Sequence, residues 1–251
     1  MNLAIDIGNT RTKFGFFKNG RLRKKVYWEE TDLKKLETLL SNQKVKNIIC
    51  STVKTVDSKF EKRIAKNRFY IRLEANTPLP IQNKYRTPKT LGKDRLAAVV
   101  GAFELYPSTS SLVIDAGTCI TYDIIDAKGN FLGGNIVPGL EMRYKAMHHF
   151  TAKLPLIERK GGRIVDIGKD TLSAMRTGGA LGTILEMEAW IQYFKKEYEV
   201  INTILTGGDG EYFAKRLKSK IFANPNLVLV GLNKILQHNV CLLYTSPSPR
   251  D

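Results

Sequence analysis

The chain has 251 residues, of which 43% are hydrophobic and 25% charged, and its formal net charge is +16. This composition is typical of a globular protein with one large domain or two smaller ones, and no apolar run approaches the roughly 20 residues of a membrane-spanning helix. The three cysteines are too few and too widely spaced for a disulfide framework or a cysteine zinc site, so we expect a cytoplasmic protein with no signal peptide and no membrane partner.

The first part of the sequence alternates between strand and helix patterns. The apolar segments LAIDIGNT and KFGFF predict a pair of strands that ends at the turn Asn19-Gly20. Thr31 is the predicted cap of a helix with Leu33, Leu36, Leu39 and Leu40 on one face. The elements expected next are a buried strand over 45–53, a short helix over 57–66, a loop over 76–90, and a helix over 91–106 that ends before Pro107.

The second part opens with another pair of strands over 112–125, followed by a turn at 128–130. The pattern then predicts a long amphipathic helix over 179–198, a strand over 202–205, a helix through Phe213 and Leu217, a strand over 227–230 (LVLV) and a helix over 231–237. Residues 240–251 (VCLLYTSPSPRD) lack periodicity and resemble a translated read-through, so we expect an unstructured, non-native tail.

The two strand pairs carry an internal repeat. Residues 3–12 read LAIDIGNTRT and residues 112–121 read LVIDAGTCIT. Each copy is an apolar strand followed by an Asp, a Gly and small hydroxyl residues. The repeat predicts two related α/β halves, 1–110 and 111–239, each beginning with a strand, a turn and a second strand.

An Asp-x-Gly-x-Thr turn at a strand end is suited to phosphate chemistry. Asp6 can hold Mg²⁺ directly or through water, the backbone of Gly8 can approach a phosphate, and the polar side chains over 9–13 can donate to its oxygens. The alternative is a hairpin turn with an Asx-type hydrogen bond. The second copy favours the functional interpretation; there, Asp115 would bind a cation or order water.

The segment Gly92-Lys93-Asp94-Arg95 opens a predicted helix. A first helical turn favours anions and offers unbonded N–H groups, so Asp94 would stay ionised and could accept the proton of a hydroxyl that attacks a phosphate. Arg95 could pair with a carboxylate through two hydrogen bonds. The alternative is that Asp94 only caps the helix. The turn GGDG over 207–210 suits a nucleotide base or ribose, or is a plain strand–helix turn.

These motifs occur in the order found in type III pantothenate kinases, and the chain resembles that family from Met1 to about Asn239. The resemblance rests on DIGNTRTK, Tyr85 with TLGKDR, DAGTCITYD, GGNIVPGL, the stretch 171–178, TGGDG and NPNLVLVGL. The family belongs to the superfamily of acetate and sugar kinases, Hsp70 and actin. The resemblance therefore implies an α/β fold of duplicated actin-like ATPase (ribonuclease H-like) domains, with mixed sheets flanked by helices and a cleft between the halves.

The resemblance also implies an activity: ATP-dependent phosphorylation of pantothenate to 4'-phosphopantothenate, the first step of coenzyme A biosynthesis, by a cytoplasmic homodimer. It makes Asp94 the catalytic proton acceptor, Asp6 a contact of Mg²⁺-ATP and Asp115 the ligand of a monovalent cation, K⁺ or NH₄⁺. The residues that it assigns to ATP are Asp6, Ile7, Gly8, Asn9, Thr10, Arg11, Thr12, Lys13 and Thr118. Those that it assigns to pantothenate are Tyr85, Gly92, Lys93, Asp94, Arg95 and Thr171.

Two other functions stay open. One is a kinase of the same superfamily that acts on a sugar or an acyl acid. The other is a non-catalytic regulator that binds nucleic acid, since the family has also been described as Baf-type transcriptional activators. Its support is the charge of residues 1–110, which hold 23 basic and 10 acidic side chains, against 17 and 14 in the rest. The basic clusters at 21–25 and 59–68 lack any nucleic-acid-binding pattern, so we interpret them as solvated faces and expect no nucleic-acid partner.

Overall fold

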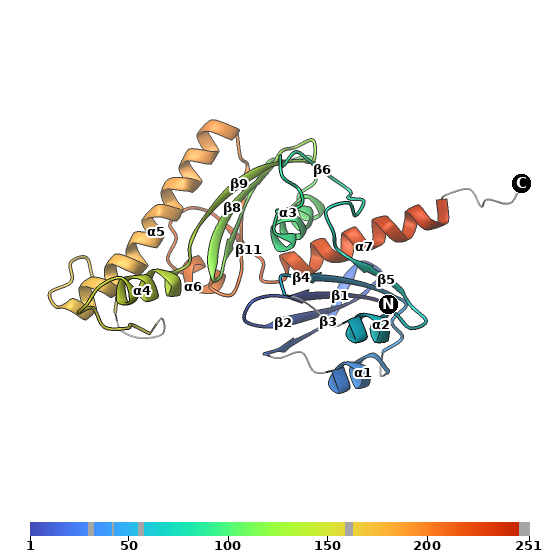
Figure 1. Ribbon diagram of the computed structural model, residues 1–251. Coiled ribbons are helices and arrows are strands. Elements are labelled where there is room, and N and C mark those ends of the chain that lie inside the picture. The colour runs from blue at the N-terminus through green and yellow to red at the C-terminus, as the bar shows by residue number, and fades with distance from the viewer. Residues whose placement is uncertain (30–32, 42, 55–57, 159–162, 246–251) are drawn as a thin grey trace, which may run out of the picture. The chain divides into compact units, whose positions relative to one another are not determined.

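The computed structural model describes residues 1–29, 33–41, 43–54, 58–158 and 163–245 (Figure 1). Its contacts divide the chain into two compact units. Unit 1 comprises Met1–Pro107, Gly129–Leu132 and Asn226–Asp251, and unit 2 comprises Ser108–Lys128 and Gly133–Pro225. None of the helices within the described residues combines the length and apolar character that crossing a membrane requires.

Unit 1 is built on a five-stranded sheet with the order β3-β2-β1-β4-β5. Its strands are β1 (Asn2–Ile7), β2 (Thr12–Lys18), β3 (Arg21–Trp28), β4 (Asn47–Thr52) and β5 (Phe69–Arg72). β1 pairs antiparallel with β2 and parallel with β4. Because side chains alternate along a strand, Leu3, Ile5 and Ile7 lie on one face of β1, and Ala4 and Asp6 lie on the other.

Different helices cover the two faces of this sheet (Figure 1). Helices α1 (Leu33–Ser41) and α2 (Ser58–Ala65) pack against the face of Leu3 and Ile5 in one buried cluster. On the other face, α7 (Leu227–Thr245) contacts β1 and β4, and it packs against α3 (Lys93–Leu105). The side-chain amide of Asn2 donates to Asn233 of α7 at 3.1 Å. Asp6 and Asn2 are four residues apart on β1, so their side chains lie on the same face of the strand, toward α3 and α7.

Helices α3 and α7 cross at two glycines. A methyl group on Gly231 would lie 1.7 Å from the carbonyl oxygen of Ala97, and one on Gly101 would lie 2.4 Å from the carbonyl oxygen of Leu227. These obstacles are backbone atoms, which no side-chain rotation can remove, so the crossing requires glycine at both positions. The close crossing holds α3, whose first turn carries Asp94, against α7.

Two predictions for the end of the chain are wrong. The expected strand over 227–230 is the first turn of α7. Four consecutive apolar residues suit a buried strand or a buried helix equally, and here Leu227, Val228 and Leu229 are all buried. The tail expected to be unstructured from residue 240 continues α7 as far as Thr245. Residues 246–251 lie outside the described part.

The second sheet has six strands in the order β11-β10-β7-β8-β9-β6. They are β6 (Gln82–Asn83), β7 (Ser111–Ala116), β8 (Cys119–Ile125), β9 (Asn130–Pro138), β10 (Asn202–Thr206) and β11 (Phe222–Ala223). β7 pairs antiparallel with β8 and parallel with β10. Five of these strands, in the order β9-β8-β7-β10-β11, correspond one by one to the strands β3-β2-β1-β4-β5 of the first sheet. The internal repeat therefore corresponds to two α/β halves with mixed sheets, as predicted.

Unit 2 contains helices α4 (Leu140–His149), α5 (Thr171–Tyr198) and α6 (Gly210–Ala214). α5 starts before its predicted beginning at 179 because Asp170 caps it. The Asp170 carboxylate accepts the Ser173 backbone N–H at 2.9 Å, and the Ser173 hydroxyl accepts the Asp170 backbone N–H at 3.2 Å. This reciprocal pair is a capping box, which satisfies two otherwise unbonded N–H groups.

The two units differ from the expected halves 1–110 and 111–239. The chain leaves unit 1 after Pro107, close to the expected boundary, but it returns to unit 1 at Gly129–Leu132 and at Asn226. The second return occurs because α7 packs on α3 and on the first sheet. The helix expected after Thr31 is present as α1, although Thr31 itself lies outside the described residues.

Candidate active site

Asp6 lies at the end of β1, between two polar neighbours on the same face of the sheet. The strand register places it opposite Lys13 on β2 and Ser51 on β4. The Lys13 ammonium is 3.6 Å from a carboxylate oxygen of Asp6, whose exposed fraction is only 6%. A hydrogen bond of 3.1 Å from the Gly8 N–H to the Arg11 carbonyl closes the following turn. The strand pair thus joins a buried carboxylate and an ammonium to a glycine turn.

The residues predicted to bind ATP divide between the two faces of this strand pair. Asn9, Thr10 and Arg11 are exposed in the turn. Ile7 and Thr12 are buried and face each other across the hairpin, on the side of α1 and α2. The side chains of Ile7 and Thr12 therefore point away from Asp6, and only their backbone is near the turn.

The charge of Asp94 reaches the buried carboxyl of Asp6. Burial raises the pKa of the Asp6 carboxyl above its usual value; the Lys13 ammonium opposes this rise, and the negative charge of Asp94 adds to it. The Asp6 carboxylate thus has the Lys13 ammonium at 3.6 Å and a second negative charge, that of Asp94, in its surroundings. Such a group of residues gains electrostatically from a bound cation, and one carboxylate together with substrate phosphates is a common way to hold Mg²⁺. The residues present fit that ion.

The first turn of α3 brings Asp94 and Gly92 into close contact. A methyl group on Gly92 would lie 2.6 Å from a carboxylate oxygen of Asp94. That oxygen accepts a hydrogen bond of 2.8 Å from the backbone N–H of Arg95. The N-cap residue of α3 is Gly92, which has no side chain to cap the helix. Asp94 is thus not the N-cap residue of the alternative interpretation. It is half-buried, which leaves its carboxylate accessible to a substrate.

Arg95 and Tyr85 form part of an aromatic stack in unit 1. The Arg95 guanidinium carbon lies 5.5 Å from the centre of the Tyr85 ring, a cation–π contact. Phe131 also packs on Tyr85, stacked at 6.0 Å between ring centres and 6° between planes. Arg95 itself is buried. The structure therefore brings Tyr85 and Arg95 together, and it places Phe131, which the sequence analysis did not single out, against Tyr85.

In unit 2 the second Asp-Gly turn packs against the GGDG turn. Gly207 has a φ of +96°, and a methyl group there would lie 2.5 Å from a carboxylate oxygen of Asp115 and 2.2 Å from the Ala116 carbonyl oxygen. The Asp209 N–H donates to the same Ala116 carbonyl at 2.8 Å. Only glycine fits at position 207, because the TGGDG turn lies so close to the Asp115 turn there.

Thr118 and Thr171 are placed by different elements of unit 2. Thr118 lies between β7 and β8, and its carbonyl accepts the Gly139 N–H at 3.1 Å. Thr171 is the exposed first residue of α5. Within the described residues, no group of three or more His, Cys, Asp or Glu side chains has a metal-binding arrangement.

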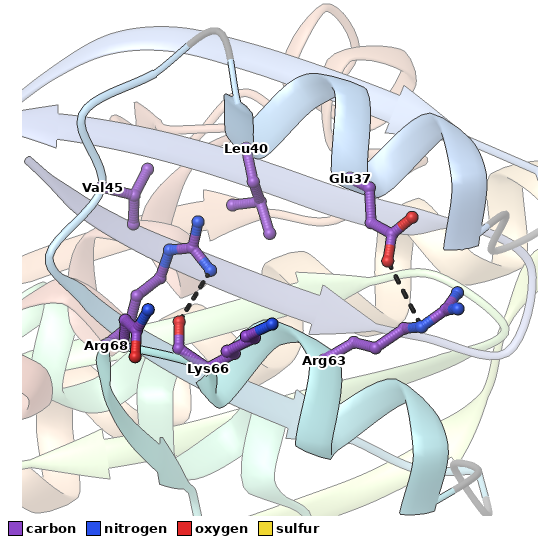
Figure 2. Close-up of a pocket in the computed structure, with 7 residues that line it drawn as sticks. Glu37, Leu40, Val45, Arg63, Lys66 and Arg68 are labelled. Atoms are coloured by element: carbon purple, nitrogen blue, oxygen red, sulfur yellow. Dashed lines mark hydrogen bonds and ion pairs between the residues drawn. The ribbon is translucent and has the colours of Figure 1, made fainter.

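Figure 2 shows a pocket of about 340 Å³ on the α1–α2 side of unit 1. Arg63 pairs with Glu37 at 3.3 Å, and Arg68 donates to the carbonyls of Ile64 and Lys66 at the end of α2. Basic side chains near the C-terminus of a helix donate hydrogen bonds to its last carbonyls and interact favourably with the negative end of the helix dipole. Arg63 and Arg68 of the basic cluster over 59–68 thus have structural partners here. The side chains that line this pocket include no predicted site residue.

Comparison with known proteins decides the family. The family profile described as type III pantothenate kinase matches residues 2–193. The chain belongs to the type III pantothenate kinase family. A type III pantothenate kinase of Bacteroides fragilis is 45% identical over 240 residues, which are 95% of this chain and 98% of that protein. The type III pantothenate kinase of Cytophaga hutchinsonii is 40% identical over 241 residues, which cover 96% of this chain and 100% of the relative.

Solved structures support the fold. A Campylobacter jejuni protein assigned to the Baf family of transcriptional activators has a TM-score of 0.62 at 24% identity, over 95% of this chain and 99% of that one. A Listeria monocytogenes protein described as an N-acetylmannosamine kinase has a TM-score of 0.52 at 12% identity, over 95% and 99%. At such low identity these likenesses show only that this type III pantothenate kinase family member shares the duplicated α/β architecture of sugar kinases.

Proposed function

We propose that this protein transfers the γ-phosphoryl group of ATP to pantothenate, giving 4'-phosphopantothenate in the first step of coenzyme A biosynthesis. The observation that carries the proposal is the pair of carboxylates in unit 1: Asp6 is buried beside a glycine turn and a lysine, and Asp94 lies in the first turn of a helix. Membership of the type III pantothenate kinase family supplies the substrate.

Asp94 is proposed as the group that orients and deprotonates the acceptor. The primary hydroxyl of pantothenate donates a hydrogen bond to its carboxylate. The hydroxyl oxygen forms a bond to the γ-phosphorus, the bond from that phosphorus to the ADP oxygen breaks, and the hydroxyl proton passes to Asp94. Phosphoryl transfer depends mainly on positioning and charge neutralisation, so orientation of the hydroxyl is expected to matter at least as much as proton removal.

The strand pair around Asp6 is proposed to hold the phosphates of ATP. Lys13 supplies a positive charge on the face of Asp6, and the turn from Gly8 to Arg11 exposes polar groups. Asp6 would hold Mg²⁺ directly or through water, and the ion when bound neutralises the charge of the phosphates. Ile7 and Thr12 would contribute through their backbone alone, since their side chains face the other side of the sheet.

Asp115 and Thr118 are proposed as further contacts, Asp115 for K⁺ or NH₄⁺ and Thr118 for ATP. The position opposite Asp115 on the neighbouring strand is Thr121, whereas the position opposite Asp6 is Lys13. The Asp115 carboxylate thus has a hydroxyl residue where Asp6 has an ammonium. In a Thr121→Lys variant the new ammonium should replace the cation, so activation by K⁺ over Na⁺ should disappear; undiminished activation would count against this role.

Pantothenate is proposed to bind the group of Tyr85, Lys93 and Arg95 in unit 1. Thr171 is proposed as a further pantothenate contact on the family resemblance. The basic side chains suit its carboxylate, and Gly92 allows the substrate to approach the Asp94 turn closely. Phe131, stacked on Tyr85, is proposed to keep that ring in place.

The decisive assay incubates purified protein with Mg²⁺-ATP and pantothenate and measures ADP and phosphopantothenate separately. Asp94→Asn should lower turnover by about 100-fold or more while ATP binding persists. Glu104→Gln, on the same helix and paired with Lys234 at 2.7 Å, is the matched control and should keep full turnover. Phosphorylation of a sugar or acyl acid in place of pantothenate would contradict the proposal, as would salt-sensitive DNA binding without kinase activity.

We also propose a homodimer in the cytoplasm. Gly178, Gly182, Leu185, Ala189 and Tyr193 follow one another at helical spacing along α5, and Leu185 and Tyr193 are 60% and 49% exposed. Small and apolar residues along one exposed face suit close packing against a second copy. Free thiols at Cys50 and Cys119 are compatible with a reducing compartment.

A further inference from the structure

The carboxylate of Glu186, in the middle of α5, joins two elements that meet at the Thr118 turn. It accepts a hydrogen bond of 2.6 Å from the guanidinium of Arg143 on α4 and one of 3.4 Å from the hydroxyl of Tyr122 on β8. Burial raises the pKa of Tyr122 and the nearby Glu186 raises it further, so the hydroxyl keeps its proton and acts as the donor. Glu186 thus links α5 to both α4 and β8.

Arg143 carries this link to the corner between β9 and α4. Its Nε donates to the Pro138 carbonyl at 2.9 Å, while its other end binds Glu186. A planar guanidinium can make both bonds at once in a fixed geometry, which a lysine cannot do. Arg143 therefore connects the carbonyl oxygen of Pro138, the last residue of β9, to Glu186 on α5.

The corner lies directly on the turn that carries Thr118. The Gly139 N–H donates to the Thr118 carbonyl at 3.1 Å, and a methyl group on Gly139 would lie 2.2 Å from the Gly117 carbonyl oxygen and 2.5 Å from that of Thr118. Backbone in such contact moves together, since protein interiors leave no slack at these distances. A shift of the corner is therefore passed on to the Gly117–Thr118 backbone.

We propose that Arg143 and Glu186 are positioning residues that set the Gly117–Thr118 turn for ATP. The proposal rests on the proposed ATP contact of Thr118. Arg143 and Glu186 are 23% and 27% exposed, so solvent reaches the ion pair and limits its contribution to stability. The pair should therefore matter more for ligand geometry than for folding.

The test compares Arg143→Gln, Arg143→Lys, Glu186→Gln and the double variant Arg143→Gln with Glu186→Gln. Each is expected to raise the KM for ATP by about tenfold, equivalent to one charged hydrogen bond, with the KM for pantothenate unchanged and kcat within about threefold of the parent. The double variant should cost no more than either single change, because both remove the same link. Arg143→Lys should fail to rescue, because it cannot span both partners.

The matched control is Lys145→Gln, which breaks the exposed Lys145–Glu141 pair of 2.7 Å on the same helix without touching the corner. It should leave both KM values unchanged. Calorimetric titration with ATP separates this proposal from the proposed function: a parent that binds ATP without phosphorylating pantothenate would refute only the function. An Arg143→Gln or Glu186→Gln protein that stays folded and binds ATP as tightly as the parent would refute the positioning role, as would an equal rise in both KM values.

Discussion

A Gly231→Ala substitution puts a methyl group where none fits. The new carbon would lie 1.7 Å from the Ala97 carbonyl oxygen, 2.7 Å from the Ala97 carbonyl carbon and 2.8 Å from the Gly101 nitrogen. Helices α3 and α7 would have to separate by more than about 1 Å, because backbone atoms cannot rotate away as side chains do. Overpacking costs about 1–3 kcal/mol, and we expect the upper end here. That corresponds to a fall of about 6–12 °C in the Tm of unit 1.

The two tryptophans let the assay address one unit at a time. Trp28 lies in β3 of unit 1 and Trp190 in α5 of unit 2, and the chain has no others. In a Trp190→Phe background, fluorescence during thermal unfolding therefore reports unit 1. Gly208→Ala is the control, since its new methyl group meets nothing within 4 Å. A Gly231→Ala protein with unit 1 melting within about 2 °C of the parent would refute the close crossing.

Three further outcomes follow from the structure. Burial raises the pKa of Asp6, so the protonated carboxyl stabilises the fold below the usual pKa of 3.8, and this stabilisation is lost as pH rises through the folded value. Asp6→Asn should therefore raise the Tm at pH 7 and raise it less at low pH. The same substitution should abolish kinase activity. Leu185→Asp should turn a dimer into a monomer in light scattering. The Ser173 hydroxyl lowers the pKa of Asp170, so the stabilising effect of the cap is lost as pH falls through the folded value. Asp170→Ala should therefore lower the unit 2 Tm at pH 7, and it should lower it less at a pH below that folded pKa.

Local patterns were enough to predict the strand pairs and most helices. The apolar segments at 3–7 and 112–116 are buried strands, and the helix expected over 91–106 is α3. Strand β3 was missed because half of its residues, RLRKKVYW, are charged and most are exposed, and its pairing with β2 defines it. Strand β9 contains two glycines and ends in proline, which removes the usual strand signal.

Residues that meet through strand register or distant packing could not be found from the sequence. Ser51 lies beside Asp6 only because β4 pairs in parallel with β1 at that register. Phe131 stacks on Tyr85 because the short strand β6 pairs with the start of β9. Neither pairing has a local signal. The stretch GGNIVPGL could have pointed to Gly139, since a glycine before a helix marks a close approach, but its partner turn is visible only in the fold.

The duplicated fold gives the same backbone corner two different electrostatic environments. In unit 1 the carboxylate at this corner is Asp6, which is buried opposite Lys13 and whose pKa is raised in part by the charge of Asp94. In unit 2 the equivalent Asp115 is half-buried, opposite Thr121 on one side and Thr206 on the other. The repeat therefore supplies the position of a carboxylate, and the residue at the facing register position decides its partner. The Asp6 corner has the ammonium group of Lys13 on one neighbouring strand, whereas the Asp115 corner has a threonine on each of its two neighbouring strands.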